Sequence, residues 1–125
     1  DMDMKLARVP YPLRIRLAAA LIAAALALAI GYYSLVPPGE APAPQISDKI
    51  RHFGAYAMLA IPVAMALAPR RLLPLGLAAS YGALLEAAQA YAGTGREASF
   101  ADGAANILGA SAGVFFIWWI ARQRG

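Results

Sequence analysis

The chain contains no cysteine and few charged residues, and both shortages restrict its class. Without cysteine it has no disulfide framework, no thiolate metal site and no cysteine nucleophile. Only 14% of its 125 residues are charged, whereas an ordinary globular domain carries roughly 25%. Hydrophobic residues make up 61% of the sequence, and a soluble protein of this size does not bury enough surface to hide them. The composition therefore indicates a protein whose surface faces an apolar environment such as a lipid bilayer.

Several functional motifs are also missing. The sequence has no serine-nucleophile motif and no H-E-x-x-H or comparable metal spacing, so hydrolytic chemistry has little support, and we expect no metal and no cofactor. The sequence pI is about 9.8, but no basic segment carries the interleaved aromatic residues or the groove-reading motif of a nucleic-acid-binding protein. We therefore expect no nucleic-acid partner.

Charged residues divide the chain into four long, mostly uncharged stretches. A helix needs about 20 apolar residues to cross the hydrocarbon core of a bilayer. We predict an all-α fold, a single membrane domain over residues 1–125 with transmembrane helices at about 15–36, 50–69, 72–91 and 101–121. Short connections favour antiparallel neighbours, which gives one compact bundle with both termini on the same side.

The basic residues predict the orientation, because cytoplasmic segments carry an excess of Lys and Arg. An N-in, C-in topology in a bacterial-type inner membrane puts eight of the 11 basic residues inside and three outside. The inner ones are Lys5, Arg8, Arg14, Arg16, Arg70, Arg71, Arg122 and Arg124, and the outer ones are Lys49, Arg51 and Arg96. The basic surplus then faces anionic headgroups, so membrane lipids are the first expected partners.

In this topology the polar residues near the helices gather at the outer ends of the second, third and fourth. Spacings of three or four residues put each pair on one helix face, as for Asp102 and Asn106. We therefore predict one polar cluster. Its members are Asp48, Lys49, His52, Glu86, Gln89, Arg96, Ser99, Asp102 and Asn106.

Glu86 is the most demanding of these residues. If its helix ends near Tyr91, the carboxyl group lies about 8 Å below the outer end. A charged side chain at the centre of a span costs on the order of 2.5 to 3.5 kcal/mol. We expect Glu86 to face the bundle and either stay protonated or pair with Arg96, His52 or Lys49. A structural ion pair and a functional role both remain open.

Other members of the cluster have structural alternatives. Ser99 and Asp102 fit a capping box at the start of the last helix, where an acidic residue also favours the helix dipole. Asn106 fits an interhelical hydrogen bond. Arg96 fits a loop charge paired with Glu97.

Small residues predict where helices approach closely. Gly109 and Gly113 form a small-xxx-small seam with Ala105 one turn earlier. Pro62 lies within the second helix, where it removes one backbone hydrogen bond and predicts a kink.

The polar residues together resemble the VanZ-like family of small bacterial membrane proteins. In that family a D-K-x-x-H-F-x-x-Y segment opens one helix, here Asp48 to Tyr56. An E-x-x-Q pair closes the next helix, here Glu86 and Gln89. An R-x-x-S-x-x-D-x-x-x-N-x-x-G run opens the last, here Arg96 to Gly109. The resemblance covers about half of the chain and adds Tyr56 to the candidate site.

This resemblance implies a four-helix inner-membrane protein and a link to resistance to the lipoglycopeptide teicoplanin. It implies no particular reaction. On the residues themselves, we favour a site for an anionic lipid-linked envelope component or cell-wall precursor, because Lys49, His52 and Arg96 supply cations at headgroup depth.

Two alternatives belong to other classes. An enzyme would use His52 as general acid or base, with Glu86 or Asp102 as its orienting partner. A non-catalytic accessory or assembly subunit of a larger membrane complex, respiratory, photosynthetic or transport, would use the polar cluster only to hold the bundle together.

Overall fold

The computed structural model describes residues 11–35, 48–92 and 100–124, and these form four helices. The helices are α2 (Leu13–Leu35), α3 (Asp48–Leu67), α4 (Leu72–Ala92) and α5 (Phe100–Arg124). Each lies within three residues of a helix predicted from the uncharged stretches. The described part of the chain is therefore all-α, as predicted.

The helix ends follow from local sequence. At the start of α2, the Pro12 carbonyl accepts hydrogen bonds from the amides of Ile15 and Arg16, at 3.0 and 3.1 Å. α3 ends at Leu67, whose carbonyl accepts a 3.0 Å hydrogen bond from the amide of Arg70 in the turn to α4. Proline is common shortly after a helix end, because it cannot continue the helix, and Pro69 follows here after a cis peptide bond.

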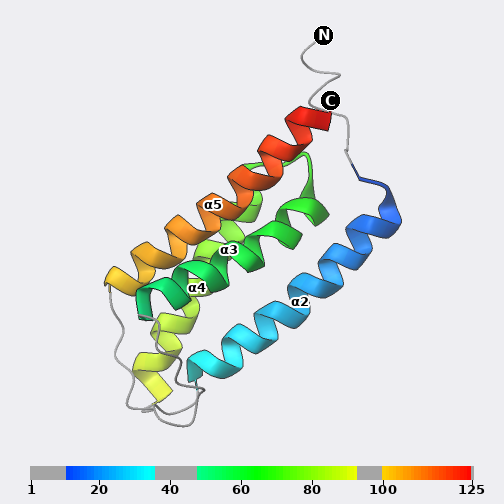
Figure 1. The fold of residues 1–125 in the computed structure, drawn as a ribbon. Coiled ribbons are helices and arrows are strands. Elements are labelled where there is room, and N and C mark those ends of the chain that lie inside the picture. The colour runs from blue at the N-terminus through cyan, green and yellow to red at the C-terminus, as the bar shows by residue number, and fades with distance from the viewer. Residues whose placement is uncertain (1–10, 36–47, 93–99, 125) are drawn as a thin grey trace.

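The four helices run alternately up and down (Figure 1). α3 is central, because it packs against α5, α2 and α4, and its contact with α5 is the most extensive. The core accordingly lies along α3 and its neighbours. Its buried members include Tyr56, Leu59, Ala60, Ala110 and Ile117.

Two glycines of α5 allow this close approach. A Cβ atom added at Gly113 would lie 2.5 Å from the carbonyl oxygen of Ala57 and 3.0 Å from the Cβ of Ala60. One added at Gly109 would clash with the carbonyl oxygen of Phe53 and lie 2.9 Å from its carbonyl carbon. The predicted small-residue seam thus lies directly against the backbone of α3.

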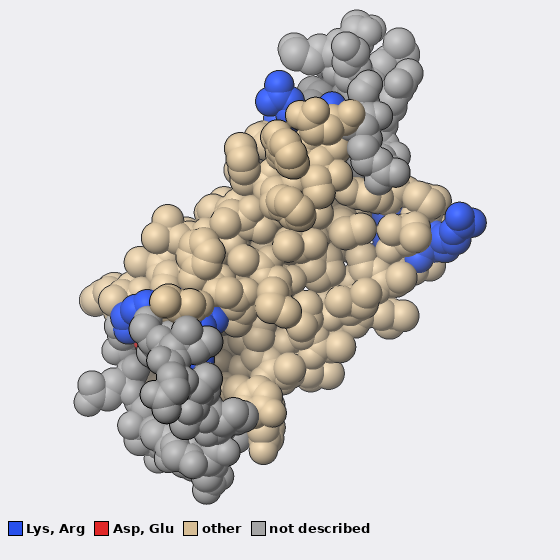
Figure 2. Space-filling view, in the orientation of Figure 1, with Lys and Arg blue, Asp and Glu red and all other residues tan. Residues whose placement is uncertain are grey.

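Much of the outer surface is apolar. Figure 2 shows Lys and Arg side chains gathered towards the ends of the molecule, with a band free of charged side chains between them on the face shown. Leu21 and Leu28 of α2 and Phe115 of α5 are among the exposed large hydrophobic residues. α2, α3 and α5 are each long and apolar enough to cross a membrane, and α4 is not among these candidates. The structure therefore indicates a membrane protein with three candidate spans.

An apolar groove of about 430 Å³ lies between α2 and α3. It is lined by Ile15, Ala18, Ala19, Ile22, Leu26, Met58, Ile61, Pro62 and Met65. Pro62, where we predicted a kink, lies inside α3 without ending it. These residues lie between the start and just beyond the middle of α2 and in the second half of α3, so the groove is separate from the polar residues described next.

Candidate functional site

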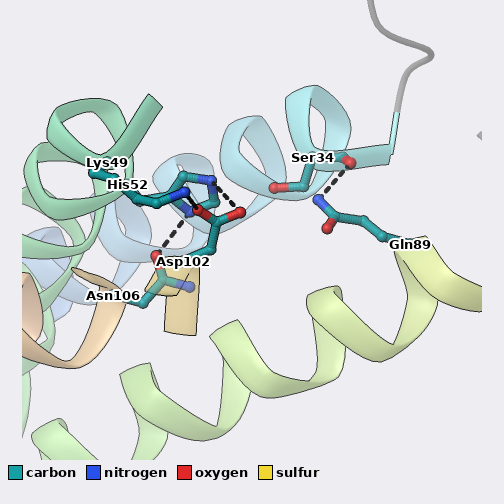
Figure 3. A network of polar contacts seen from close by, with 6 residues as sticks. All are labelled: Ser34, Lys49, His52, Gln89, Asp102 and Asn106. Atoms are coloured by element: carbon teal, nitrogen blue, oxygen red, sulfur yellow. Dashed lines mark hydrogen bonds and ion pairs between the residues drawn. The ribbon is translucent and has the colours of Figure 1, made fainter. Parts of the chain in front are cut away.

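Asp102 lies at the centre of a polar cluster near one end of the bundle (Figure 3). It belongs to the first turn of α5, where a negative charge interacts favourably with the helix dipole. Its side chain is only 9% exposed, and its Oδ1 accepts a hydrogen bond from the ammonium of Lys49 on α3. The Nε2 atom of His52, also on α3, lies 3.6 Å from Oδ2. Asp102 therefore connects the first turn of α5 to α3.

His52 is held from its other ring nitrogen. Its Nδ1 lies 2.9 Å from the Oδ1 of Asn106, one turn after Asp102 on α5. An amide oxygen only accepts, so Nδ1 must carry the proton in this contact. In the neutral tautomer the acceptor nitrogen is then Nε2, the atom that faces Asp102.

Glu86 brings α4 into the same site. One carboxylate oxygen of Glu86, one ring nitrogen of His52 and one carboxylate oxygen of Asp102 all lie within 4.8 Å of one another. Glu86 and His52 are partly buried and Asp102 is buried. We call Lys49, His52, Glu86, Asp102 and Asn106 the polar cluster, and the end of the bundle where α3 begins and α4 ends the polar end.

The polar cluster lies next to a tightly packed part of the bundle. Gly82 of α4 is buried, and a Cβ atom added there would lie 3.0 Å from the Nδ2 of Asn106 and 3.2 Å from the Cε2 of Tyr56. Tyr56 is itself only 2% exposed and belongs to the hydrophobic core. Tyr56 and Asn106 thus both pack against Gly82, which links the polar cluster to the hydrophobic core.

Gln89 hydrogen-bonds the end of α2. Its Nε2 donates a 2.8 Å hydrogen bond to the carbonyl oxygen of Ser34 near the end of α2. Figure 3 shows this contact apart from the group around Asp102. Although we expected Gln89 to join the residues of the second and fourth helices, it holds the ends of α2 and α4 together instead.

Three predicted site residues are not placed. Arg96 and Ser99 lie outside the residues that the structure describes. Asp48 begins α3, but its side chain also lies outside the described part. The expected Arg96 partner of Glu86 and the Ser99 cap are therefore left as predictions.

The sequence reasoning missed two residues of α4. Tyr81 donates a hydrogen bond across the bundle to the carbonyl oxygen of Ala27 on α2, and Gly82 admits Asn106 and Tyr56. Buried tyrosine hydroxyls usually find a partner, so a tyrosine in the middle of an apolar stretch was the available indication. No comparable indication pointed to Gly82, because a single glycine is common in membrane helices.

In the polar cluster, basic and acidic side chains lie close together in a small, partly buried volume. From α3 come an ammonium and an imidazole, and from α4 and α5 come two carboxylates. Such a group can hold a bundle together, bind an ion or a charged headgroup, or move a proton between its members. Comparison of the chain with protein-family models, with curated proteins and with solved structures finds no match. Function must therefore be argued from this geometry.

Proposed function

We propose that the protein is a VanZ-like membrane protein of the bacterial inner membrane whose polar end lies at the outer leaflet and binds the anionic headgroup of a lipid-linked envelope component. The observation that carries the proposal is the joining of Lys49, His52 and Asp102 across α3 and α5 at one end of an otherwise apolar bundle. A link to glycopeptide resistance belongs to the same proposal and rests on the family resemblance alone.

The proposal includes α4 as a fourth span. Its 21 residues extend about 31 Å at 1.5 Å per residue, which matches a hydrocarbon core of about 30 Å. Its leucines at 72, 77 and 84 are exposed as if to lipid. The residues that lower its hydropathy, Glu86 and Gln89, are partly buried and buried, respectively, so they need not contact the hydrocarbon.

The distribution of basic residues supports the orientation. Among the described residues, Arg14, Arg16, Arg70, Arg71 and Arg122 lie at the start of α2, in the turn between α3 and α4, and near the end of α5. In the up-and-down bundle these segments share one end (Figure 1). Lys49 and Arg51 lie at the polar end. The positive-inside rule therefore favours a polar end that faces outward.

Lys49 is the residue through which an anionic headgroup would first be recognised. Its side chain is 49% exposed although its ammonium contacts Asp102, and exposed Arg51 adds a second cation at the same end. Hydrogen bonds from charged donors to phosphate are stronger than neutral ones. An ammonium has three donors, so the half-exposed Lys49 can donate to a phosphate while its contact with Asp102 stays in place.

Binding to defined lipids tests this function. The protein, in nanodiscs or detergent, is titrated with a polyprenyl diphosphate and, for comparison, with neutral phosphatidylcholine, and bound lipid is counted by native mass spectrometry. Lys49→Met removes one charged donor, which corresponds to roughly a tenfold or greater loss of affinity for the diphosphate. Arg70→Gln is the matched control, because Arg70 is an exposed cation at the opposite end. Equal affinity for both lipids, or no effect of Lys49→Met, refutes the proposal.

An accessory subunit of a larger membrane complex is a second candidate. It is favoured by the pairing of Lys49 with Asp102, because a cluster that only holds helices together needs its charges matched internally. Purification in mild detergent decides this point. A stoichiometric partner that remains bound supports the accessory role, and a solitary protein counts against it.

A further inference from the structure

We propose that His52, Glu86 and Asp102 form a binding site for one divalent transition metal ion, with Zn²⁺ as the best match. The inference does not depend on the headgroup-binding function, since it concerns the carboxylate and imidazole ligands rather than the cations of the cluster. Local sequence motifs could not predict this metal site, because each ligand comes from a different helix.

The distances between the ligand atoms fit a bound ion. Ligand atoms about 2.1 Å from a tetrahedral Zn²⁺ are separated from one another by about 3.4 Å. The Nε2 of His52 and the Oδ2 of Asp102 are 3.6 Å apart. That separation is too long for a hydrogen bond but close to the spacing that a shared ion requires. One ring nitrogen of His52 and one carboxylate oxygen from each of Glu86 and Asp102 lie within 4.8 Å of one another, so small side-chain rotations would bring all three residues onto one ion.

The histidine is oriented as metal-binding histidines are. Such residues almost always donate their second ring N–H to a carboxylate, a carbonyl or water, which fixes the tautomer and the direction of the ring. Here the Nδ1 of His52 meets the amide oxygen of Asn106 at 2.9 Å. That contact makes Nε2 the metal-binding atom and aims it at Asp102.

Charge gives a second reason for a cation at this point. Two carboxylates and the acceptor nitrogen of a neutral imidazole converge in a partly buried volume, where like charges are costly. A divalent ion between the two carboxylates would lower this cost further, beside the Lys49 ammonium that already contacts Asp102. Lys49 contacts Oδ1 of Asp102, whereas His52 faces Oδ2, so a metal on Oδ2 does not require Lys49 to leave.

The donor set selects the class of metal. An imidazole nitrogen suits Zn²⁺ and its transition-metal neighbours, whereas Mg²⁺ and Ca²⁺ prefer oxygen ligands throughout. Three protein ligands also leave a fourth position on Zn²⁺ for water or an incoming anion. We therefore expect Zn²⁺ and Co²⁺ to bind and Mg²⁺ to fail at similar concentrations.

The composition makes the test unusually clean, because His52 is the sole histidine and the chain has no cysteine. After removal of any affinity tag and treatment with a chelator, the full chain in detergent is titrated with Zn²⁺ by calorimetry and with Co²⁺ by visible absorption. We expect one ion per chain and the absorption bands of tetrahedral Co²⁺. His52→Gln is expected to lower the affinity more than 100-fold, and Asn106→Ala, which leaves the ligands intact, 10- to 100-fold.

Lys49→Met separates this inference from the headgroup function. Removal of a neighbouring positive charge is expected to leave Zn²⁺ affinity equal or tighter, whereas the headgroup function requires the same variant to weaken diphosphate binding. Helical circular dichroism and thermal unfolding confirm that each variant is folded. The metal site is refuted if the wild-type chain binds no Zn²⁺ at one ion per chain, if folded His52→Gln binds it equally well, or if Lys49→Met weakens it.

Discussion

Substitution of Gly109 by alanine tests the packing that the rest of the site depends on. The added methyl group would clash with the carbonyl oxygen of Phe53 and lie 2.9 and 3.0 Å from its carbonyl carbon and Cα. All three atoms belong to the backbone of α3, so no side-chain rotation can make room. α5 must instead move away from α3, which is its most extensive partner.

The expected cost follows from two opposing terms. Overpacking a well-packed interior destabilises by roughly 1–3 kcal/mol, while replacing glycine by alanine within a helix contributes a gain of roughly 0.5–1 kcal/mol. Gly103→Ala is the matched control, because it lies in the same helix and an added Cβ meets nothing within 4 Å. The helical gain is common to both variants, so we expect Gly109→Ala to be less stable than Gly103→Ala by the overpacking cost alone, about 1–3 kcal/mol.

Reversible unfolding in mixed micelles, followed by circular dichroism, measures this difference directly. The same samples report on the site, because a displaced α5 carries Asp102 and Asn106 away from α3. Gly109→Ala should therefore also weaken Zn²⁺ binding, whereas Gly103→Ala should leave it intact. If the two variants unfold at the same denaturant concentration, the close approach of α3 and α5 is refuted.

Further predictions concern single contacts. Gln89→Leu removes the hydrogen bond from α4 to the end of α2 and should destabilise by about 1 kcal/mol, measured in the same unfolding assay; unchanged stability would refute the contact. A double-mutant cycle of His52→Ala and Asn106→Ala should give a coupling energy of about 0.6–1.7 kcal/mol, and a value of zero contradicts their 2.9 Å contact. The guanidinium of Arg71 lies 3.5 Å from the ring centre of Trp118, so Arg71→Gln should cost about 0.5–1 kcal/mol and shift the tryptophan fluorescence; an identical emission spectrum would count against the stacking.

The helices were predictable because they depend on the length of uncharged runs, which is visible directly in the sequence. Runs of uncharged residues long enough to cross a bilayer leave few alternatives to a helix, and the stretch predicted at 72–91 is found as Leu72–Ala92. That this helix spans the membrane stays a prediction, because α4 is not among the three candidate spans. Its carboxyl and amide groups lower the mean hydropathy, and the bundle then shelters them.

The sequence predicted that some of the polar residues meet, but not which side chain contacts which. Helical spacing put Asp102 and Asn106 on one face, and the antiparallel order brought that face to the end where Lys49 and His52 lie. Which side chain contacts which depends on the rotation of each helix about its axis and on the side-chain rotamers. Neither can be predicted from the spacing of residues along the sequence. For that reason Gln89 was expected within the cluster, although it hydrogen-bonds the backbone of α2.

The dominance of the α3–α5 contact also has a consequence for biogenesis. Ribosomes deliver helices in chain order, and 54 residues separate His52 from Asn106. At roughly 5–20 residues per second, α3 waits about 3–10 s for α5 to be synthesised. During that interval its histidine and lysine have no residue of α5 to contact, so the polar end is completed only when the last helix has been made.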